Sequence, residues 1–125
     1  MPTVLYGEDD KEHRIMMRFY LRNTDITLLE ASNGQEVLQK IQEHRPDLIL
    51  LDLFMPKLDG YGVMQALKAN PDTKDIPIIV ISAWPTGINR KRAQEAGAVD
   101  FIIKPYDPFR LVKIIEDKLA DEAES

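Results

Sequence analysis

Acidic residues and a lysine follow short apolar runs at three well-separated places in the sequence. The acidic cluster Glu8–Asp10 follows the first run, Asp52 ends a later run, and Lys104 ends the last one. In an open parallel sheet with helices on both faces, the carboxyl ends of the strands form the ligand crevice. If the runs are strands of such a sheet, the carboxylates meet there and bind a hard cation such as Mg²⁺. The ammonium group beside them can hold an anionic group, such as a phosphoryl.

The composition is that of a soluble globular protein. Of the 125 residues, 44% are hydrophobic and 30% are charged, which fits one domain with its own core. There is no cysteine, so disulfides and thiolate metal sites are excluded. The formal net charge of -5 argues against a nucleic-acid-binding surface, which requires concentrated lysine and arginine.

Apolar runs alternate with segments of helical periodicity, an order typical of an α/β protein with a parallel sheet. The run 48–51 is uniformly apolar, as expected for a strand that is buried on both faces. Right-handed crossovers then predict a five-stranded parallel sheet of order 2-1-3-4-5, the flavodoxin-like arrangement. The predicted strands are 4–6, 26–30, 48–51, 76–81 and 101–103, and the predicted helices are 11–23, 34–45, 59–70, 90–96 and 108–119.

The first predicted helix directly follows the acidic cluster. Asp10 is expected to cap its amino end, since aspartate accepts hydrogen bonds from the free N–H groups of a first turn. Three residues are predicted to form its apolar face: Met16, Phe19 and Tyr20. His13 and His44 are assigned to the surface, because neither has a metal-ligating partner at helical spacing.

We expect a single domain over residues 1–125 with a polar tail from about residue 120. The sequence has no signal-peptide pattern and no apolar run of the ~20 residues that a membrane span requires. This predicts a cytoplasmic protein that does not contact a membrane. Met1 is expected to be the natural start, and any output domain would have followed Ser125.

Taken together, these motifs resemble those of the receiver domain of a two-component response regulator. The similarity extends from Thr3 to about Leu119. Each motif alone is common, but here all of them occur in the family's order and at matching intervals. The motifs are Glu8-Asp9-Asp10, Asp52 with Met55-Pro56 and Asp59-Gly60, Ser82-Ala83, and Lys104-Pro105.

The resemblance implies a role for each residue of the predicted site. Asp52 would accept a phosphoryl group from a histidine kinase or a phosphotransfer protein. Asp9 would ligate Mg²⁺ directly and Glu8 would act on it through water, while the main-chain carbonyl of Phe54 would be a further ligand. Lys104 would pair with a phosphoryl oxygen and offset its charge.

The resemblance also implies a switch. The hydroxyl of Ser82 would hydrogen-bond the phosphoryl group and move inward, and the ring of Phe101 would fill the space behind it. The peptide bond before Pro105 would be cis, which turns Lys104 toward the site. The alternative for Ser82 is an ordinary strand-end hydroxyl, and on the residues alone Phe101 is more often a core residue than a switch.

The resemblance implies that two large apolar side chains border the phosphoryl pocket. Phe54 and Trp84 lie two residues beyond Asp52 and Ser82, respectively. Large groups at these positions would restrict the water that hydrolyses an acyl phosphate. We therefore expect slow dephosphorylation.

The sequence predicts a stand-alone phosphoacceptor switch with Mg²⁺ as cofactor. The protein would take part in its own phosphorylation and dephosphorylation without being a classed enzyme. Its expected partners are a histidine kinase or phosphotransfer protein and an unidentified downstream protein, with no direct contact to nucleic acid. The chain would be a monomer or a phosphorylation-dependent dimer.

Three alternatives remain at this point. The first is an interaction module that keeps the fold without using phosphorylation. The second is a hydrolase with a phospho-aspartyl intermediate, which needs a general acid at the position that Phe54 occupies. The third is a nucleotide- or flavin-binding protein, which is disfavoured because no glycine-rich phosphate loop follows the first strand.

Overall fold

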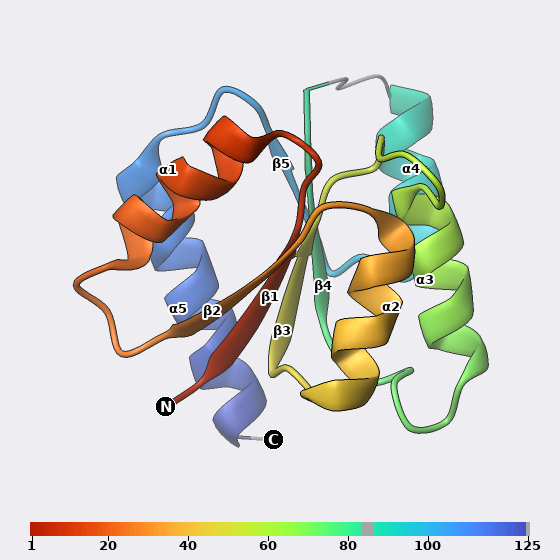
Figure 1. The fold of residues 1–125 in the computed structure, drawn as a ribbon, viewed down its shortest axis with the longest axis horizontal. Helices are drawn as coiled ribbons and strands as arrows, with labels where there is room; N and C mark the ends of the chain where they lie inside the picture. Colours follow the sequence, from red (N-terminus) through yellow and green to blue (C-terminus); the bar gives the residue numbers. More distant parts are fainter. Residues whose placement is uncertain (84–86, 125) are drawn as a thin grey trace.

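The computed structural model describes residues 1–83 and 87–124, which form a parallel sheet between two layers of helices (Figure 1). The strand order is β2-β1-β3-β4-β5, so the predicted fold is confirmed. Helices α1 and α5 cover one face of the sheet, and α2, α3 and α4 cover the other (Figure 1). The elements are β1 (Thr3–Gly7), α1 (Lys11–Leu21), β2 (Thr27–Ala31), α2 (Gly34–Glu43), β3 (Leu48–Leu51), α3 (Gly60–Ala69), β4 (Ile78–Ser82), α4 (Gly87–Glu95), β5 (Asp100–Ile103) and α5 (Pro108–Glu124).

The central strand β3 is buried on both faces. All four of its residues are 0% exposed. Side chains alternate across a strand, so Ile49 and Leu51 pack with residues of α2 and α3, while Leu48 and Leu50 pack with residues of α1 and α5. This two-sided burial explains why the sequence of the strand shows no polar alternation.

Polar caps begin the helices that follow the carboxyl edge of the sheet. The Asp10 side chain accepts hydrogen bonds from the N–H groups of Glu12 and His13, which confirms it as the cap of α1. The side chains of Asn33 and Asp59 likewise accept hydrogen bonds from first-turn N–H groups and cap α2 and α3. The acidic loop after β1 therefore runs directly into a helix whose start is fixed.

Of the predicted apolar face, Tyr20 packs partly buried against the core, whereas Met16 and Phe19 do not belong to the buried face of α1. Its buried residues are Met17 and Leu21, whereas the side chains of Met16 and Phe19 are 46% and 57% exposed. The helix has more apolar residues than one face can hold, so periodicity alone does not say which of them face the sheet. The spacing of Met17 and Leu21 by four residues decides the contact with the sheet and α5.

Most element ends lie within two residues of the prediction, and two differ more. Helix α4 begins at Gly87 and not at Arg90, because its polar sequence carries almost no apolar periodicity. Helix α5 continues through the polar tail to Glu124, beyond the predicted end at Leu119. Within the described part of the chain, no helix is long and apolar enough to cross a membrane.

Gly60, at the start of α3, lies against the backbone that carries Asp52. A Cβ atom at this position would lie 2.6 Å from the carbonyl oxygen of Asp52 and 2.8 Å from Cα of Leu53. Backbone atoms cannot move aside as a side chain can. Gly60→Ala is therefore expected to lower the free energy of unfolding by about 2 kcal/mol, a typical cost of overpacking.

Urea denaturation of Gly60→Ala measures this cost, and Gly62→Ala in the same helix is its control. A Cβ atom at Gly62 would meet the end of the Leu58 side chain at 2.5 Å, and that side chain can rotate away. In a helix interior, alanine is also more favourable than glycine. Equal destabilisation by the two substitutions would contradict the argument.

Candidate functional site

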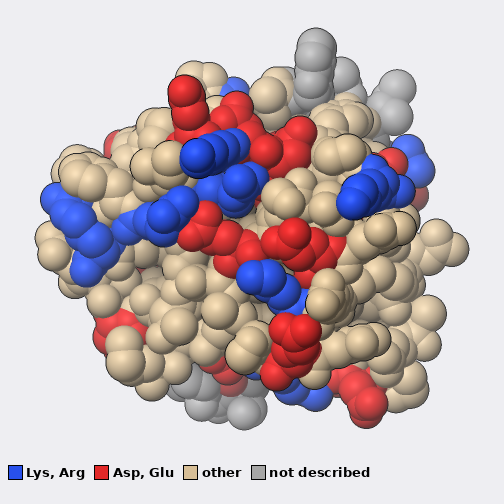
Figure 2. Space-filling model, viewed as in Figure 1, with Lys and Arg blue, Asp and Glu red and all other residues tan. Residues whose placement is uncertain are grey.

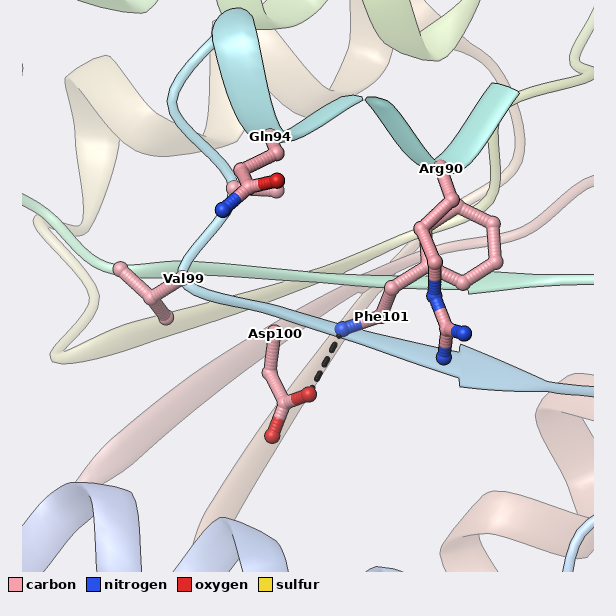
Figure 3. A pocket seen from close by; sticks show the side chains of 6 residues that line it. Arg90, Gln94, Val99, Asp100 and Phe101 are labelled. Atoms are coloured by element: carbon pink, nitrogen blue, oxygen red, sulfur yellow. Dashed lines mark hydrogen bonds between the residues drawn. The ribbon is translucent and has the colours of Figure 1, made fainter. Parts of the chain in front are cut away.

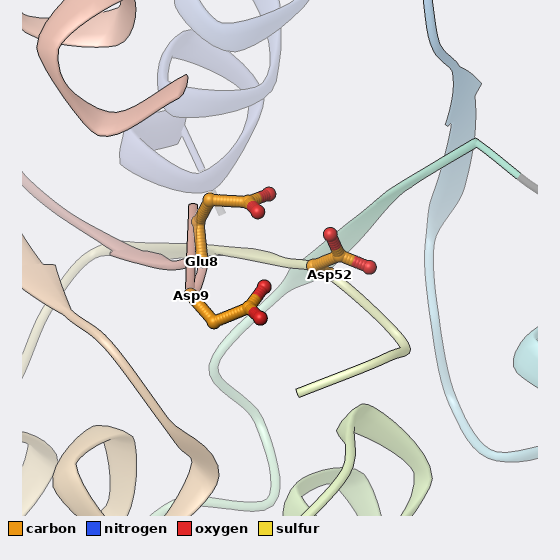
Figure 4. Close-up of side chains that lie close together, drawn as sticks. All are labelled: Glu8, Asp9 and Asp52. Atoms are coloured by element: carbon orange, nitrogen blue, oxygen red, sulfur yellow. The ribbon is translucent and has the colours of Figure 1, made fainter. Parts of the chain in front are cut away.

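The carboxyl edge of the sheet brings the predicted residues together. Glu8 and Asp9 follow β1, Asp52 follows β3 and Lys104 follows β5. The carboxylate oxygens of Glu8, Asp9 and Asp52 lie within 4.8 Å of one another (Figure 4). In Figure 2 acidic side chains gather at this upper edge, and basic side chains lie beside them over α1. The sequence-based prediction of convergence is thus confirmed for these residues.

Backbone hydrogen bonds hold the site at the ends of the strands. The N–H of Asp52 donates to the carbonyl of Gly7 at 3.0 Å, which ties the end of β3 to the end of β1. The N–H of Lys104 donates to the carbonyl of Ser82 at 2.9 Å, which ties β5 to β4. The peptide bond between Lys104 and Pro105 is cis, as the resemblance implied.

The three carboxylates differ in exposure. Glu8 is 1% and Asp52 is 7% exposed, whereas Asp9 is exposed to solvent. Oδ1 of Asp52 accepts a hydrogen bond from the N–H of Phe54 at 3.0 Å, and Oδ2 faces Lys104. The Phe54 ring itself is 46% exposed at the rim. Both oxygens of Asp52 are thus held in defined positions near the surface.

Lys104 is the cation of the site. Its Nζ lies 2.6 Å from Oε2 of Glu8, 3.1 Å from Oδ2 of Asp52 and 3.1 Å from Nδ1 of His13. Burial by itself would lower the pKa of the ammonium, but the hydrogen bond to Glu8 and the charge of Asp52 outweigh burial and raise it. The ammonium therefore stays charged and attracts anions.

Glu8 lies at the centre of this network. Burial raises the pKa of its carboxyl, as does the neighbouring Asp52, and the hydrogen bond from Lys104 opposes the increase. Oε2 also accepts from the hydroxyl of Tyr6 at 3.3 Å, and Oε1 accepts from the N–H of Asp10 at 3.1 Å. Burial, followed by the charge of Glu8, raises the pKa of Tyr6.

The sequence interpretation missed two residues of the site, Tyr6 and His13. The side chain of His13 is 41% exposed, in line with its assignment to the surface, but that assignment did not foresee its contact with Lys104. Helical side chains lean toward the amino end, so a first-turn residue lies over the preceding acidic loop. Side chains two residues apart along a strand point to the same face, so Tyr6 and Glu8 lie on one face. His44 is exposed, as predicted.

Ser82 and Phe101 lie on the paired strands β4 and β5. Ser82 ends β4 and is 0% exposed. Phe101 pairs in register with Val80 and is partly buried, with the guanidinium of Arg90 5.5 Å from the centroid of its ring. The ring borders a pocket of about 220 Å³ between α4 and β5 (Figure 3). Trp84 lies outside the described residues.

The donor set fits a hard divalent cation. Glu8, Asp9 and Asp52 offer carboxylate oxygens only, and Asp9 lies on the solvent side. Mg²⁺ prefers oxygen ligands, is commonly bound through one or two carboxylates, and keeps several of its waters. An open cluster with one exposed carboxylate suits this chemistry better than a closed all-protein cage.

A model of the response regulator receiver domain matches residues 4–116 of this chain. The chain belongs to this family. The matched residues include the acidic cluster, Asp52 and Lys104, and the sheet order is the flavodoxin-like order of this family.

Individual relatives agree with this assignment. The transcriptional regulatory protein ResD of Bacillus subtilis is 38% identical over 109 residues, which is 87% of this chain and 44% of ResD. The probable transcriptional regulator ycf27 of Cyanidium caldarium is 36% identical over 116 residues, 93% of this chain and 45% of that protein. This receiver domain thus spans less than half of either relative.

Solved structures show the same fold. A putative response regulator from Chloroflexus aurantiacus is 32% identical, with a TM-score of 0.89 over 96% of this chain and 99% of that one. The receiver domain of a signal transduction histidine kinase from Syntrophus aciditrophicus is 30% identical, with a TM-score of 0.89 over 97% and 92% of the two chains.

Proposed function

We propose that this receiver domain is a signalling switch that accepts a phosphoryl group on Asp52. The observation that carries the proposal is the placement of the Asp52 carboxylate. One oxygen is held by the N–H of Phe54 at 3.0 Å, and the other faces the Lys104 ammonium at 3.1 Å. Asp52 is thus a largely buried nucleophile, 7% exposed, beside a fixed cation and two further carboxylates.

The reaction is an in-line displacement. An oxygen of Asp52 attacks the phosphorus of a phosphohistidine, the P–O bond forms while the P–N bond breaks, and the imidazole leaves. Lys104 pairs with a phosphoryl oxygen and offsets the charge of the incoming group. The product is an acyl phosphate on Asp52.

Carboxylate and phosphoryl oxygens repel each other, so the site needs a further cation. Asp9 and Asp52 would hold Mg²⁺ directly. The main-chain carbonyl of Phe54 would be a third protein ligand, and Glu8 would act through water. When bound, Mg²⁺ supplies the positive charge that offsets this repulsion.

Ser82 and Phe101 would carry the signal to the surface. The hydroxyl of Ser82 hydrogen-bonds the new phosphoryl oxygens, and Phe101 follows into the space behind it. The face formed by α4, β5 and α5 then changes, because Phe101 lies on it next to Arg90. A change at this face controls a downstream protein.

The proposed role implies which partners the protein has and where it acts. The upstream partner is a histidine kinase or a phosphotransfer protein, and the downstream partner is a protein. A net charge of -5 supports a protein over a nucleic acid as the direct target. We propose a cytoplasmic single domain that acts as a monomer or as a phosphorylation-dependent dimer, without being a classed enzyme.

The test is mass spectrometry of the protein after incubation with acetyl phosphate and Mg²⁺. We expect the mass of one added phosphoryl group, mapped to the peptide that contains Asp52, and no addition when a chelator removes Mg²⁺. An unmodified protein would instead favour a receiver-like interaction module that works without phosphorylation. Rapid turnover of a small phosphomonoester would favour a hydrolase.

The lifetime of the phosphoryl group is a separate prediction. The N–H of Phe54 donates to Asp52 and its side chain is half-exposed, and we propose that this side chain shields the acyl phosphate from an attacking water. Phe54→Asn replaces the ring by a polar side chain and is expected to speed dephosphorylation about tenfold, a barrier change of ~1.4 kcal/mol. Phe109→Asn, at an 88% exposed residue of α5, is the matched control.

Loss of the phosphoryl group is followed by mass spectrometry after the donor has been removed. Trp84→Ala tests the second shielding position of the sequence analysis in the same assay. A wild-type half-life of seconds that neither substitution changes would contradict the shielding hypothesis.

A further inference from the structure

His13 contacts the cation of the site from outside the carboxylate cluster. Its Nδ1 atom lies 3.1 Å from Nζ of Lys104, and its Nε2 atom lies 3.9 Å from Oδ2 of Asp10. An ammonium group only donates hydrogen bonds, so Nδ1 must be the acceptor and Nε2 carries the proton. The ring therefore links the α1 cap to the cation of the phosphoryl site.

The three N–H donors of Lys104 match three acceptors. These are Oε2 of Glu8, Oδ2 of Asp52 and Nδ1 of His13, at 2.6, 3.1 and 3.1 Å. A phosphoryl group on Asp52 changes the acceptor on one side of the ammonium. The acceptors from Glu8 and His13 do not depend on the phosphoryl group and can remain in place.

The ring is well placed for this contact because its backbone is fixed. The N–H of His13 donates to Oδ1 of Asp10 at 3.3 Å, as part of the cap of α1. The lysine side chain, by contrast, has a flexible four-carbon stem, and a side chain of this kind loses much rotamer freedom when it is ordered. An acceptor on a capped helix thus restrains the mobile end of Lys104.

We propose that His13 is a positioning residue for Lys104. Its Nδ1 acceptor, together with Glu8, aims the remaining N–H of the ammonium at Asp52 and hence at an incoming phosphoryl group. The role rests on the proposed function, since Lys104 acts on the phosphoryl group. His13 itself neither binds the phosphoryl group nor gives it a proton.

Two substitutions separate the acceptor from the bulk of the ring. In His13→Asn the amide oxygen takes the place of Nδ1, and in His13→Leu a methyl group takes it. His13→Leu is expected to lower the rate of phosphorylation by acetyl phosphate at saturating Mg²⁺ by about fivefold, which corresponds to one ordinary hydrogen bond. His13→Asn is expected to recover most of the rate, because it keeps the acceptor.

His44→Leu is the matched control, since His44 is exposed at the far end of α2 and does not contact the site. Urea denaturation of each variant shows whether the domain remains folded. A His13→Leu rate equal to that of the wild type would overturn the proposal. So would equal losses in His13→Leu and His13→Asn, because the effect would then be bulk packing.

The contact also has a readout that does not involve phosphorylation. In ¹⁵N-labelled protein, the Nδ1 resonance of His13 is expected to shift in Lys104→Met, which removes its donor. A resonance that does not shift would disprove the contact. If the wild type takes up no phosphoryl group, the proposed function fails, and the spectrum still decides whether His13 holds Lys104.

Discussion

Asp52→Asn is expected to abolish phosphorylation and to stabilise the unphosphorylated domain at neutral pH. The amide has no nucleophilic carboxylate oxygen, so acetyl phosphate and Mg²⁺ should add no phosphoryl group. Asparagine keeps the size of the side chain and the oxygen that accepts from the N–H of Phe54. The loss of labelling should therefore be complete without loss of the fold, and mass spectrometry measures it directly.

The stability gain follows from the pKa of Glu8. Burial and then the neighbouring Asp52 raise this pKa, so the folded state favours the protonated carboxyl. A raised pKa costs stability as the pH rises above the carboxyl's usual value of 4.5, and below that value the cost disappears. Removal of the Asp52 charge lowers the pKa of Glu8 and relieves part of the cost at pH 7.

Urea denaturation at pH 7 and pH 4 without Mg²⁺ measures this difference. Asp75→Asn makes the same change in charge at an exposed residue before β4 and is expected to have little effect. Phosphoryl uptake by Asp52→Asn would show that another residue is the acceptor. An equal effect on stability at both pH values would show that charge repulsion at the site is unimportant.

Lys104→Met is expected to slow phosphorylation by about 100-fold, which is the usual cost of removing one preorganised donor from a charged transition state. Methionine keeps most of the length of the stem and fills similar space. The site then loses the cation that faces both Glu8 and Asp52. The rate is measured with acetyl phosphate at saturating Mg²⁺, with Lys113→Met on α5 as the control, since Lys113 is 77% exposed.

The same substitution is expected to destabilise the fold by up to about 3 kcal/mol at neutral pH, because it leaves two buried carboxylates without their partner. Lys104 lowers the pKa of Glu8, so its loss raises that pKa further. The destabilisation is then present above the ordinary carboxyl pKa and fades as the pH falls below it. A Lys104→Met protein with wild-type rate and stability would mean that Lys104 is only a solvated strand end.

Several parts of the fold and site could be predicted from the sequence because they depend on local order along the chain. Uniformly apolar runs such as 48–51 predict strands that are buried on both faces, and alternation with helices predicts the parallel sheet. Residues that end such strands must meet at one edge. Glu8, Asp52 and Lys104 were predicted to converge for this reason, and their side chains do so.

Tertiary structure decided what periodicity leaves open. Helix α1 has apolar residues on more than one face, and only packing against the sheet and α5 selects Met17 and Leu21 over Met16 and Phe19. Periodicity also leaves the end of α5 open, because its last turns carry acidic residues and show no apolar pattern.

The sequence by itself determined which residue types could do the chemistry and that they lie on one edge, because the ends of the strands are marked locally and all strands of a parallel sheet end at the same edge. The contacts around Lys104 were decided by the folded chain. His13 and Tyr6 reach Glu8 and Lys104 from a helix turn and a neighbouring strand position. The contact of His13 depends on the angle at which α1 packs on the sheet, and that angle is set by the sum of many distant side-chain contacts.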